Sequence, residues 1–391
     1  LGENMTLASK NSLSEKFHGF YGSAPDIMAY APGRIEVLGN HTDYNDGLVL
    51  STATDLYTYF AVKNTESKNA SVHSFDMDSS AELGLDDALK VKIPGQWSNY
   101  IKGVLVELAK LGKIKPFKAV IYSDVPLSAG MSSSAALEVS TCFALGKLFG
   151  IELDKKEWAK LGQRVENNYM GLKSGLLDQF SSIYGEKDKL ILCDFRTIEV
   201  IDKVQFPSDF VFVIVNSMIK HNLVESDYNL RRESCEKAVV SIQKKFPQIK
   251  ALRDVTPSML VECKGIVDFT DYMRAAHVVS EGDLVMKGID ALRKGNIELF
   301  GSYLYASHAS SKANFENSCP ELDYLVEVSK TIPGCLGARL SGGGFGGISI
   351  HLVKKEMADD YRKRIAAAYK VQIGKDPQTF VCGVGSGAGL Y

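Results

Sequence analysis

The most constraining feature of the sequence is the segment from Asp124 to Ala136, where a short strand meets glycine, three serines and a long helix. Gly130 precedes the serines, and apolar periodicity continues to Phe149, before a glycine. Free N–H groups and the dipole at a helix N-terminus favour phosphate. One serine suffices for an N-cap, and the lysine of a Walker loop is absent. We therefore predict a phosphate loop over Gly130–Ser134, with hydroxyls that can also bind magnesium.

A second segment, Ala31–Asn45, follows a strand with a dense row of hydrogen-bonding side chains. The row consists of Asn40, His41, Thr42, Asp43, Tyr44 and Asn45. Such a row suits a hydroxyl-rich ligand, because each sugar hydroxyl both donates and accepts. A polar turn that caps its own backbone is the simpler interpretation when the segment is taken alone.

A third segment, Ser341–Gly347, contains five glycines between two predicted strands. Gly342, Gly344 and Gly347 match the spacing GxGxxG, but a strand follows them instead of a helix, so the dinucleotide fingerprint fails. The glycines indicate either a loop that brings backbone close to a ligand or a sharp hairpin turn. The sequence does not separate these two interpretations.

Two acidic residues, Glu166 and Asp178, flank a short intervening segment. Asp178 has apolar neighbours that would hold its carboxylate firmly. One carboxylate beside an acceptor hydroxyl can take or orient its proton, while another holds magnesium. Two surface acids on helices are the simpler alternative.

Hydrophobic periodicity predicts interspersed helices and strands without a strict βαβ rhythm, so we expect an α+β fold. Turn signals fall at Pro32-Gly33 and Asn45-Asp46-Gly47. The predicted strands lie at 27–63 (interrupted by these turns), 117–123, 210–216, near 338, at 348–353 and at the end of the chain. The predicted helices lie at 97–112, from the serines 132–134 to about 149, and at 155–169, 227–245, 270–279, 282–294, 296–313 and 355–370. A domain change near 190–210 divides the chain into residues 1–200 and 201–391.

Composition excludes several other classes of protein. Lys and Arg number 45 against 47 Asp and Glu and are scattered, so no nucleic-acid partner is expected. The seven cysteines form no CxxC pair and indicate reduced thiols in a cytoplasmic protein. No apolar run is long enough to span a bilayer, and the polar stretch 1–16 lacks a signal-peptide core. We expect no membrane partner.

Taken together and in this order, the three motifs resemble the galactokinases of the GHMP kinase superfamily. The stretches Gln96–Val104 and Tyr228–Arg232 add to the resemblance, which runs from about Ala31 to the last strand. It implies a two-domain GHMP kinase fold with the active site in a cleft between the domains. It also implies that ATP and Mg²⁺ act with a small-molecule sugar, whose anomeric hydroxyl receives the phosphate. We expect a monomer.

The resemblance implies a role for each matching position. Asp178 would accept or orient the proton of the sugar hydroxyl, and Arg34 would stand beside the transferred phosphate. Magnesium would lie at Ser133 or Ser134 and Glu166, and Gly343–Gly346 would border the active site. The sugar-contacting positions are Asn40, His41, Asp43, Gly175 and Tyr228. The nucleotide-contacting positions are Trp97, Tyr100, Gly130, Ser132, Ser133 and Ser134.

One departure from the family pattern concerns the sugar. Galactokinases usually have Asn at the position of Glu36 and Glu at the position of Asn40, and the family glutamate contacts the sugar. Exchange of an acceptor-only carboxylate for an amide changes what that corner tolerates. One hypothesis is that Glu36 restores the carboxylate and galactose remains the substrate, which we favour. The other is that the site prefers a sugar altered at C6, such as galacturonate.

Three further functions remain as alternatives. A galactokinase-like sensor binds sugar and ATP without turnover, but such sensors can lose residues after the serine run, and Ser134-Ala135-Ala136 is intact here. GHMP kinases for mevalonate, homoserine or a heptose phosphate lack the string His41–Asn45. A kinase for N-acetylgalactosamine stays open, because the pocket at the sugar's 2-position cannot be inferred from sequence.

Overall fold

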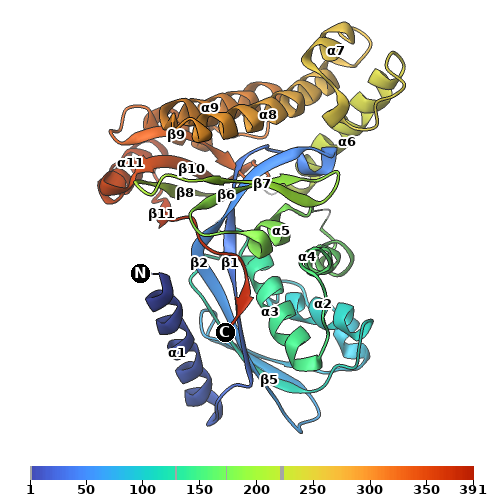
Figure 1. Cartoon of the computed structure of the whole chain (residues 1–391), viewed down its shortest axis with the longest axis vertical. Coiled ribbons are helices and arrows are strands. Elements are labelled where there is room, and N and C mark those ends of the chain that lie inside the picture. The colour runs from blue at the N-terminus through green and yellow to red at the C-terminus, as the bar shows by residue number, and fades with distance from the viewer. Residues whose placement is uncertain (1, 128–129, 173, 221–223) are drawn as a thin grey trace.

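The computed structural model describes residues 2–127, 130–172, 174–220 and 224–391. Residues 128–129, which directly precede the predicted phosphate loop, lie outside this range. Two β-sheets, each packed with helices, make up the fold (Figure 1). This arrangement confirms the α+β prediction.

The first sheet is a mixed sheet in which all neighbouring strands pair antiparallel, apart from one parallel pair, β3 with β5. Its main path runs β12-β1-β2-β5-β3-β4, and β6 pairs with both β2 and β7. Its strands are β1 (Ile27–Leu38), β2 (Leu48–Asn64), β3 (Ala70–Ser74), β4 (Ser79–Leu83), β5 (Phe117–Ser123), β6 (Lys189–Asp194), β7 (Glu199–Gln205) and β12 (Gly389–Leu390). The last strand pairs with β1 near the start of the chain, so both halves of the sequence contribute to this sheet.

Helices pack on both sides of this sheet. A core that includes Phe60, Val104 and Phe180 joins it to four helices, α2 (Ser98–Ala109), α3 (Ser133–Phe149), α4 (Lys155–Arg164) and α5 (Leu177–Tyr184). On the other side, α1 (Gly2–Tyr21) packs Leu13 and Phe17 against β2 and β5 (Figure 1). The polar stretch at the N-terminus is therefore helical, which the sequence analysis did not predict.

The second sheet is antiparallel, with the order β11-β8-β10-β9. Its strands are β8 (Phe210–Lys220), β9 (Cys335–Ser341), β10 (Gly346–Lys354) and β11 (Gln378–Cys382). Side chains alternate along β8, so Phe212 and Ile214 face the core with α8 (Phe269–Arg293) and α9 (Ile297–Ser310). The opposite face, with Val213, packs on α10 (Pro320–Ser329) and α11 (Ala358–Ile373).

A helical extension projects from the second sheet (Figure 1). It contains α6 (Val224–Gln243), α7 (Pro257–Glu262) and the first part of α8, with a small core of their own. The sequence predicted two helices at 270–279 and 282–294, but α8 is continuous through Gly282. A single glycine without proline weakens a helix without ending it.

Other differences from the predictions have clear physical causes. Pro32-Gly33 makes no turn: β1 continues through it, and the register with β2 shifts between Pro32 and Arg34, as at a β-bulge. The turn predicted at Asn45–Gly47 is confirmed, with Asp46 in the left-handed conformation. The division at residues 1–200 and 201–391 stays a prediction; the second sheet begins at β8, whereas β12 returns to the first.

Within the described ranges, no helix is both long and apolar enough to cross a membrane. All seven cysteines are free thiols.

Candidate active site

The first motif continues from β1 into a loop held by buried polar contacts. Glu281 on α8 accepts hydrogen bonds from the backbone N–H groups of Gly39 and Asn40, each 2.9 Å long. The Thr42 hydroxyl donates to the carbonyls of Gly39 and Leu48. These contacts place the side chains that follow Gly39 on one wall of a cavity.

This first cavity has a volume of about 270 Å³. It is lined by Arg34, Glu36, Asn40, His41, Asp43, Gly171, Leu172, Ser174, Gly175, Leu177, Asp178, Tyr228, Asn229, Gly342 and Gly343. All five predicted sugar-contacting positions line this cavity. Position 175 must be glycine, because the Cβ atom of any other residue would lie 1.7 Å from the Asp43 carboxylate.

His41 lies between aromatic rings. Its ring is 4.5 Å from that of Phe315 and 5.1 Å from that of Tyr228, centroid to centroid. Its Nδ1 pairs with the Tyr44 hydroxyl at 2.7 Å and its Nε2 with the Gly343 carbonyl at 3.2 Å. Burial lowers the pKa of His41 to about 3, so the ring is neutral at physiological pH.

The buried carboxyl group of Asp43 has a pKa near neutral pH. Burial and the charge of Glu36 raise its pKa from 3.8 to about 7. Between these values the native carboxyl holds a proton that the unfolded chain has released, so the free energy of unfolding falls as pH rises. We expect the wild type to lose stability relative to Asp43→Asn between pH 4 and 7, by less than about 1.4 kcal/mol per pH unit. Urea denaturation of both proteins across this range measures the difference; a difference independent of pH contradicts the prediction.

A second cavity, of about 350 Å³, lies at the start of α3. Its lining contains Arg34, Tyr100, Gly130, the three serines Ser132–Ser134 and most of the Ser341–Ile348 segment. The predicted phosphate loop and the glycine run therefore face the same space. Ser132 does not act as an N-cap through its side chain, because its hydroxyl donates to Asp178 instead.

Trp97 and Tyr100, the two aromatic residues among the predicted nucleotide contacts, differ in their placement. The Tyr100 hydroxyl hydrogen bonds to Ser134, and Tyr100 lines the second cavity. Trp97 lies outside both cavity linings, half-buried against the first core, with its indole N–H donating to Ser79 at 3.4 Å.

Arg34 and Asp178 lie where the two cavities meet. The guanidinium Nε donates to Asp178 Oδ1 at 2.7 Å, and Nη1 donates to the Gly130 carbonyl at 2.8 Å. Arg34, Gly342 and Gly343 line both cavities. A cation and a carboxylate that are 144 residues apart in the sequence thus converge beside the serine loop.

Glu166 lies in a π-helical turn, Val165–Met170, that follows α4. Its side chain is buried and accepts a hydrogen bond from the Ser174 hydroxyl. Burial and the charge of Asp178 raise the pKa of Glu166. The carboxylate therefore lacks full compensation of its charge, and a cation beside it would be stabilising.

The glycine run of the third motif connects β9 to β10 and closes over both cavities. Gly344 has φ +84°, and a Cβ atom there would stand 2.1 Å from the Asn317 carbonyl oxygen. Only glycine fits this close approach. The Asn317 amide also donates to the Gly343 carbonyl at 3.3 Å. The run therefore joins two antiparallel strands and also lines both cavities, so the two interpretations are compatible.

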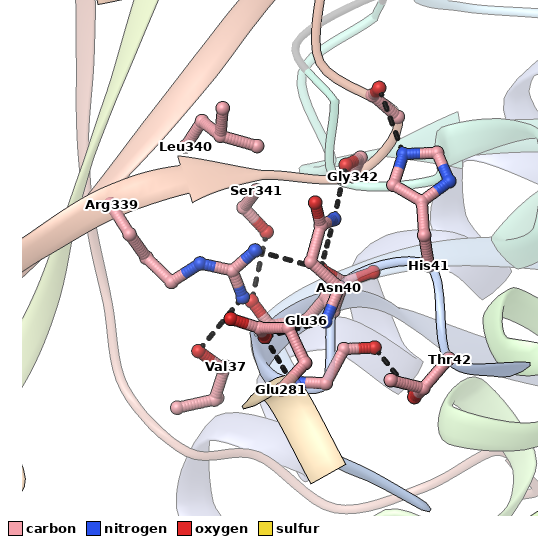
Figure 2. A network of polar contacts seen from close by, with 12 residues as sticks. Glu36, Val37, Asn40, His41, Thr42, Glu281, Arg339, Leu340, Ser341 and Gly342 are labelled. Atoms are coloured by element: carbon pink, nitrogen blue, oxygen red, sulfur yellow. Dashed lines mark hydrogen bonds and ion pairs between the residues drawn. The ribbon is translucent and has the colours of Figure 1, made fainter. Parts of the chain in front are cut away.

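A buried polar network joins the first and third motifs (Figure 2). Glu36 Oε1 accepts hydrogen bonds from Asn40 Nδ2 at 2.8 Å and from Arg339 Nη2 at 3.1 Å. Asn40 Nδ2 also donates to the Gly342 carbonyl, and Arg339 Nη1 donates to the Val37 carbonyl. Arg339 is fully buried, so Glu36 is its charge partner.

Sequence reasoning missed Arg339, Glu281 and Asn317. Arg339 did carry a signal, because a charged residue within an apolar strand is seldom fully buried unless it is paired. Glu281 and Asn317 carried none, since their partners are 241 and 277 residues away in the chain.

Comparison with known proteins agrees with this geometry. Three family models match: the GHMP kinases N-terminal domain at residues 99–186, the galactokinase galactose-binding signature at 15–64, and the GHMP kinases C-terminal domain at 289–371. The fold is thus that of a GHMP kinase. A galactokinase of Roseiflexus sp. is 35% identical over 98% of this chain and 97% of its own. The chain belongs to the galactokinase family.

Other relatives support the same assignment. A galactokinase of Thermotoga maritima is 35% identical over 88% of this chain and 95% of its own. The crystal structure of Lactococcus lactis galactokinase complexed with galactose superimposes with a TM-score of 0.89 at 33% identity, over 97% of this chain and 99% of that chain. A mevalonate kinase, with a TM-score of 0.62 and 21% identity, shares the fold.

Proposed function

We propose that the protein transfers the γ-phosphoryl group of ATP to the anomeric hydroxyl of galactose, giving galactose 1-phosphate and ADP. One observation carries this proposal: Arg34 and Asp178 stand at the junction between a cavity lined by polar side chains and a cavity formed by a helix N-terminus and glycines. A sugar in the first cavity and a triphosphate in the second would meet at this pair. Family membership supports the same reaction.

The two residues have complementary roles in this proposal. Asp178 orients the sugar hydroxyl toward the γ-phosphorus and takes up its proton as the new O–P bond forms and the bond to the ADP oxygen breaks. Arg34, held by Asp178 and the Gly130 carbonyl, offsets negative charge on the transferred group. The free N–H groups at the start of α3 bind the remaining phosphate oxygens.

The residues present fit a magnesium ion. Glu166 is a buried carboxylate whose pKa is raised by burial and by the charge of Asp178, and Ser134 lines the second cavity. Within the described part of the chain, no group of three or more His, Cys, Asp or Glu could hold a metal. Mg²⁺ usually binds through one or two carboxylates together with substrate phosphates and water. When bound, the ion would neutralise charge on the triphosphate; Ser134 (or Ser133) and Glu166 would hold it.

The remaining assignments complete the proposal. Tyr100 and Trp97 would lie near the adenine, and His41, Asp43, Gly175 and Tyr228 would contact the sugar. Free cysteines are typical of proteins in a reducing compartment, so we propose a cytoplasmic location. We also propose that the protein is a monomer.

An ADP-release assay with ATP, Mg²⁺ and a panel of sugars tests the reaction. The panel contains galactose, galacturonate, N-acetylgalactosamine and glucose. We expect the highest kcat/KM with galactose, and a phosphorus NMR signal coupled to the anomeric proton of the product. Faster turnover of galacturonate or N-acetylgalactosamine would assign a different substrate. Binding of galactose and ATP without ADP release would assign a sensor.

A further inference from the structure

Glu36 presents one uncommitted oxygen to the first cavity. Its Oε1 accepts hydrogen bonds from the side chains of both Asn40 and Arg339, whereas no described residue donates a hydrogen bond to Oε2. Glu36 lines the cavity although its side chain is only 7% exposed. A carboxylate oxygen in this position is an acceptor without a protein donor, and a ligand hydroxyl is the group that would complete it.

Asn40, in contrast, has little left to offer a ligand. Its side chain is buried, and both N–H groups of its amide are used, one by Glu36 and one by the Gly342 carbonyl. Its Oδ1 accepts from Asn317 Nδ2 at 3.0 Å. Three of its four hydrogen-bonding positions are therefore filled within the protein, and a turn toward a ligand would leave buried partners unsatisfied. Figure 2 shows Asn40 between Glu36 and Gly342.

Arg339 fixes where the negative charge lies. It is fully buried and donates to Glu36 Oε1 and to the Val37 carbonyl. A buried cation of this kind requires a charged partner, so the carboxylate cannot be moved or removed cheaply. The first cavity thus has a carboxylate anchored at one oxygen and free at the other.

We propose that Glu36 is the residue that selects the sugar: its free Oε2 accepts a hydroxyl hydrogen bond from a neutral hexose, and its fixed charge rejects a uronate. Asn40 and Arg339 are positioning residues that act through Glu36. This inference rests on the proposed function, because it assumes that the first cavity holds the sugar.

The test compares Glu36→Gln with the wild type for galactose and galacturonate. Asn40 and Arg339 are both donors, so they would hold the new side-chain oxygen and turn the amide nitrogen toward the cavity. We expect the galactose KM to rise at least about ten-fold, because a hydrogen bond to a charged carboxylate is replaced by a weaker one between neutral groups. The KM for ATP should stay within about two-fold, and the ratio of kcat/KM for galacturonate to that for galactose should rise at least about ten-fold.

Two further variants separate selection from structural damage. Asn317→Ala disturbs the same network without removing charge, so the galacturonate ratio should stay within about two-fold of the wild type. Glu36→Asp keeps the charge but withdraws the oxygen by one methylene, so the galactose KM should rise while galacturonate stays excluded. Glu36→Asp keeps the proposal testable if Glu36→Gln does not fold, as judged by circular dichroism.

Two results would overturn the proposal. The first is an unchanged galactose KM in Glu36→Gln or Glu36→Asp. The second is an equal rise of the galacturonate ratio in Asn317→Ala. The sugar panel with the wild type distinguishes failure of the role of Glu36 from failure of the proposed function. If the wild type prefers another neutral hexose, the same variants are measured with that hexose. A wild type that prefers galacturonate, or that uses no sugar, overturns the selection by Glu36 as well.

Discussion

Asp178→Asn is expected to lower kcat for galactose by about 10³-fold, within the range found when a general base is removed. The amide retains the shape of the side chain but cannot take up the proton of the sugar hydroxyl. The contacts with Arg34 and Ser132 keep the new side chain in place. Steady-state kinetics with a coupled ADP assay measures the change.

Nucleotide binding should change little in this variant, because Asp178 lines the first cavity, where we propose that the sugar binds, and not the second. We expect the dissociation constant for ATP, measured by calorimetry, to stay within about three-fold. Asp360→Asn is a matched control: its carboxylate is 59% exposed and pairs only with Arg364 among the described residues, so kinetics should equal those of the wild type. Turnover near the wild-type rate in Asp178→Asn would remove Asp178 as the base.

Arg34→Ala is expected to lower kcat by about 10²- to 10³-fold through loss of charge stabilisation at the transferred phosphoryl group. The effect should exceed that of a surface arginine, because Arg34 is buried, contacts Asp178 and the Gly130 carbonyl at once, and lines both cavities. Kinetics with galactose and ATP varied in turn measure how the loss divides between kcat and the two KM values.

Arg34→Lys separates charge from geometry. Lysine returns the positive charge but lacks the planar fork that reaches two acceptors. We expect partial recovery, with kcat between those of Arg34→Ala and the wild type. Equal activity of Arg34→Lys and the wild type would mean that the two-point geometry is unimportant. Equal activity of Arg34→Ala and the wild type would exclude Arg34 from the reaction.

The sequence predicted elements that depend on local patterns. The strand Phe117–Ser123, the helix that begins after Ser132 and its end at Gly150 are all confirmed. Each depends on alternation, on 3.6-residue periodicity or on a glycine after the last turn. The convergence of Arg34 and Asp178 was inferred from the family resemblance, because a contact between residues 144 positions apart leaves no local signal.

The sequence could not predict features that depend on tertiary partners. Glu36 stood out only as a departure from the family pattern; that its charge is paired with Arg339 became visible only in the fold. Ser132 has the residue type and the position of an N-cap, yet its hydroxyl donates to Asp178 and not to the helix backbone. In both cases a distant side chain competes with the local interaction and prevails.

The return of β12 to β1 bears on how the chain folds during synthesis. Ala29 and Tyr30 pair with Leu390 and Gly389, so this stretch of β1 has an open edge until residues 389 and 390 have been made. Unpaired strand edges on partly folded chains invite association with other molecules. Nascent chains that end before residue 389 should therefore depend more on chaperones than chains that include β12.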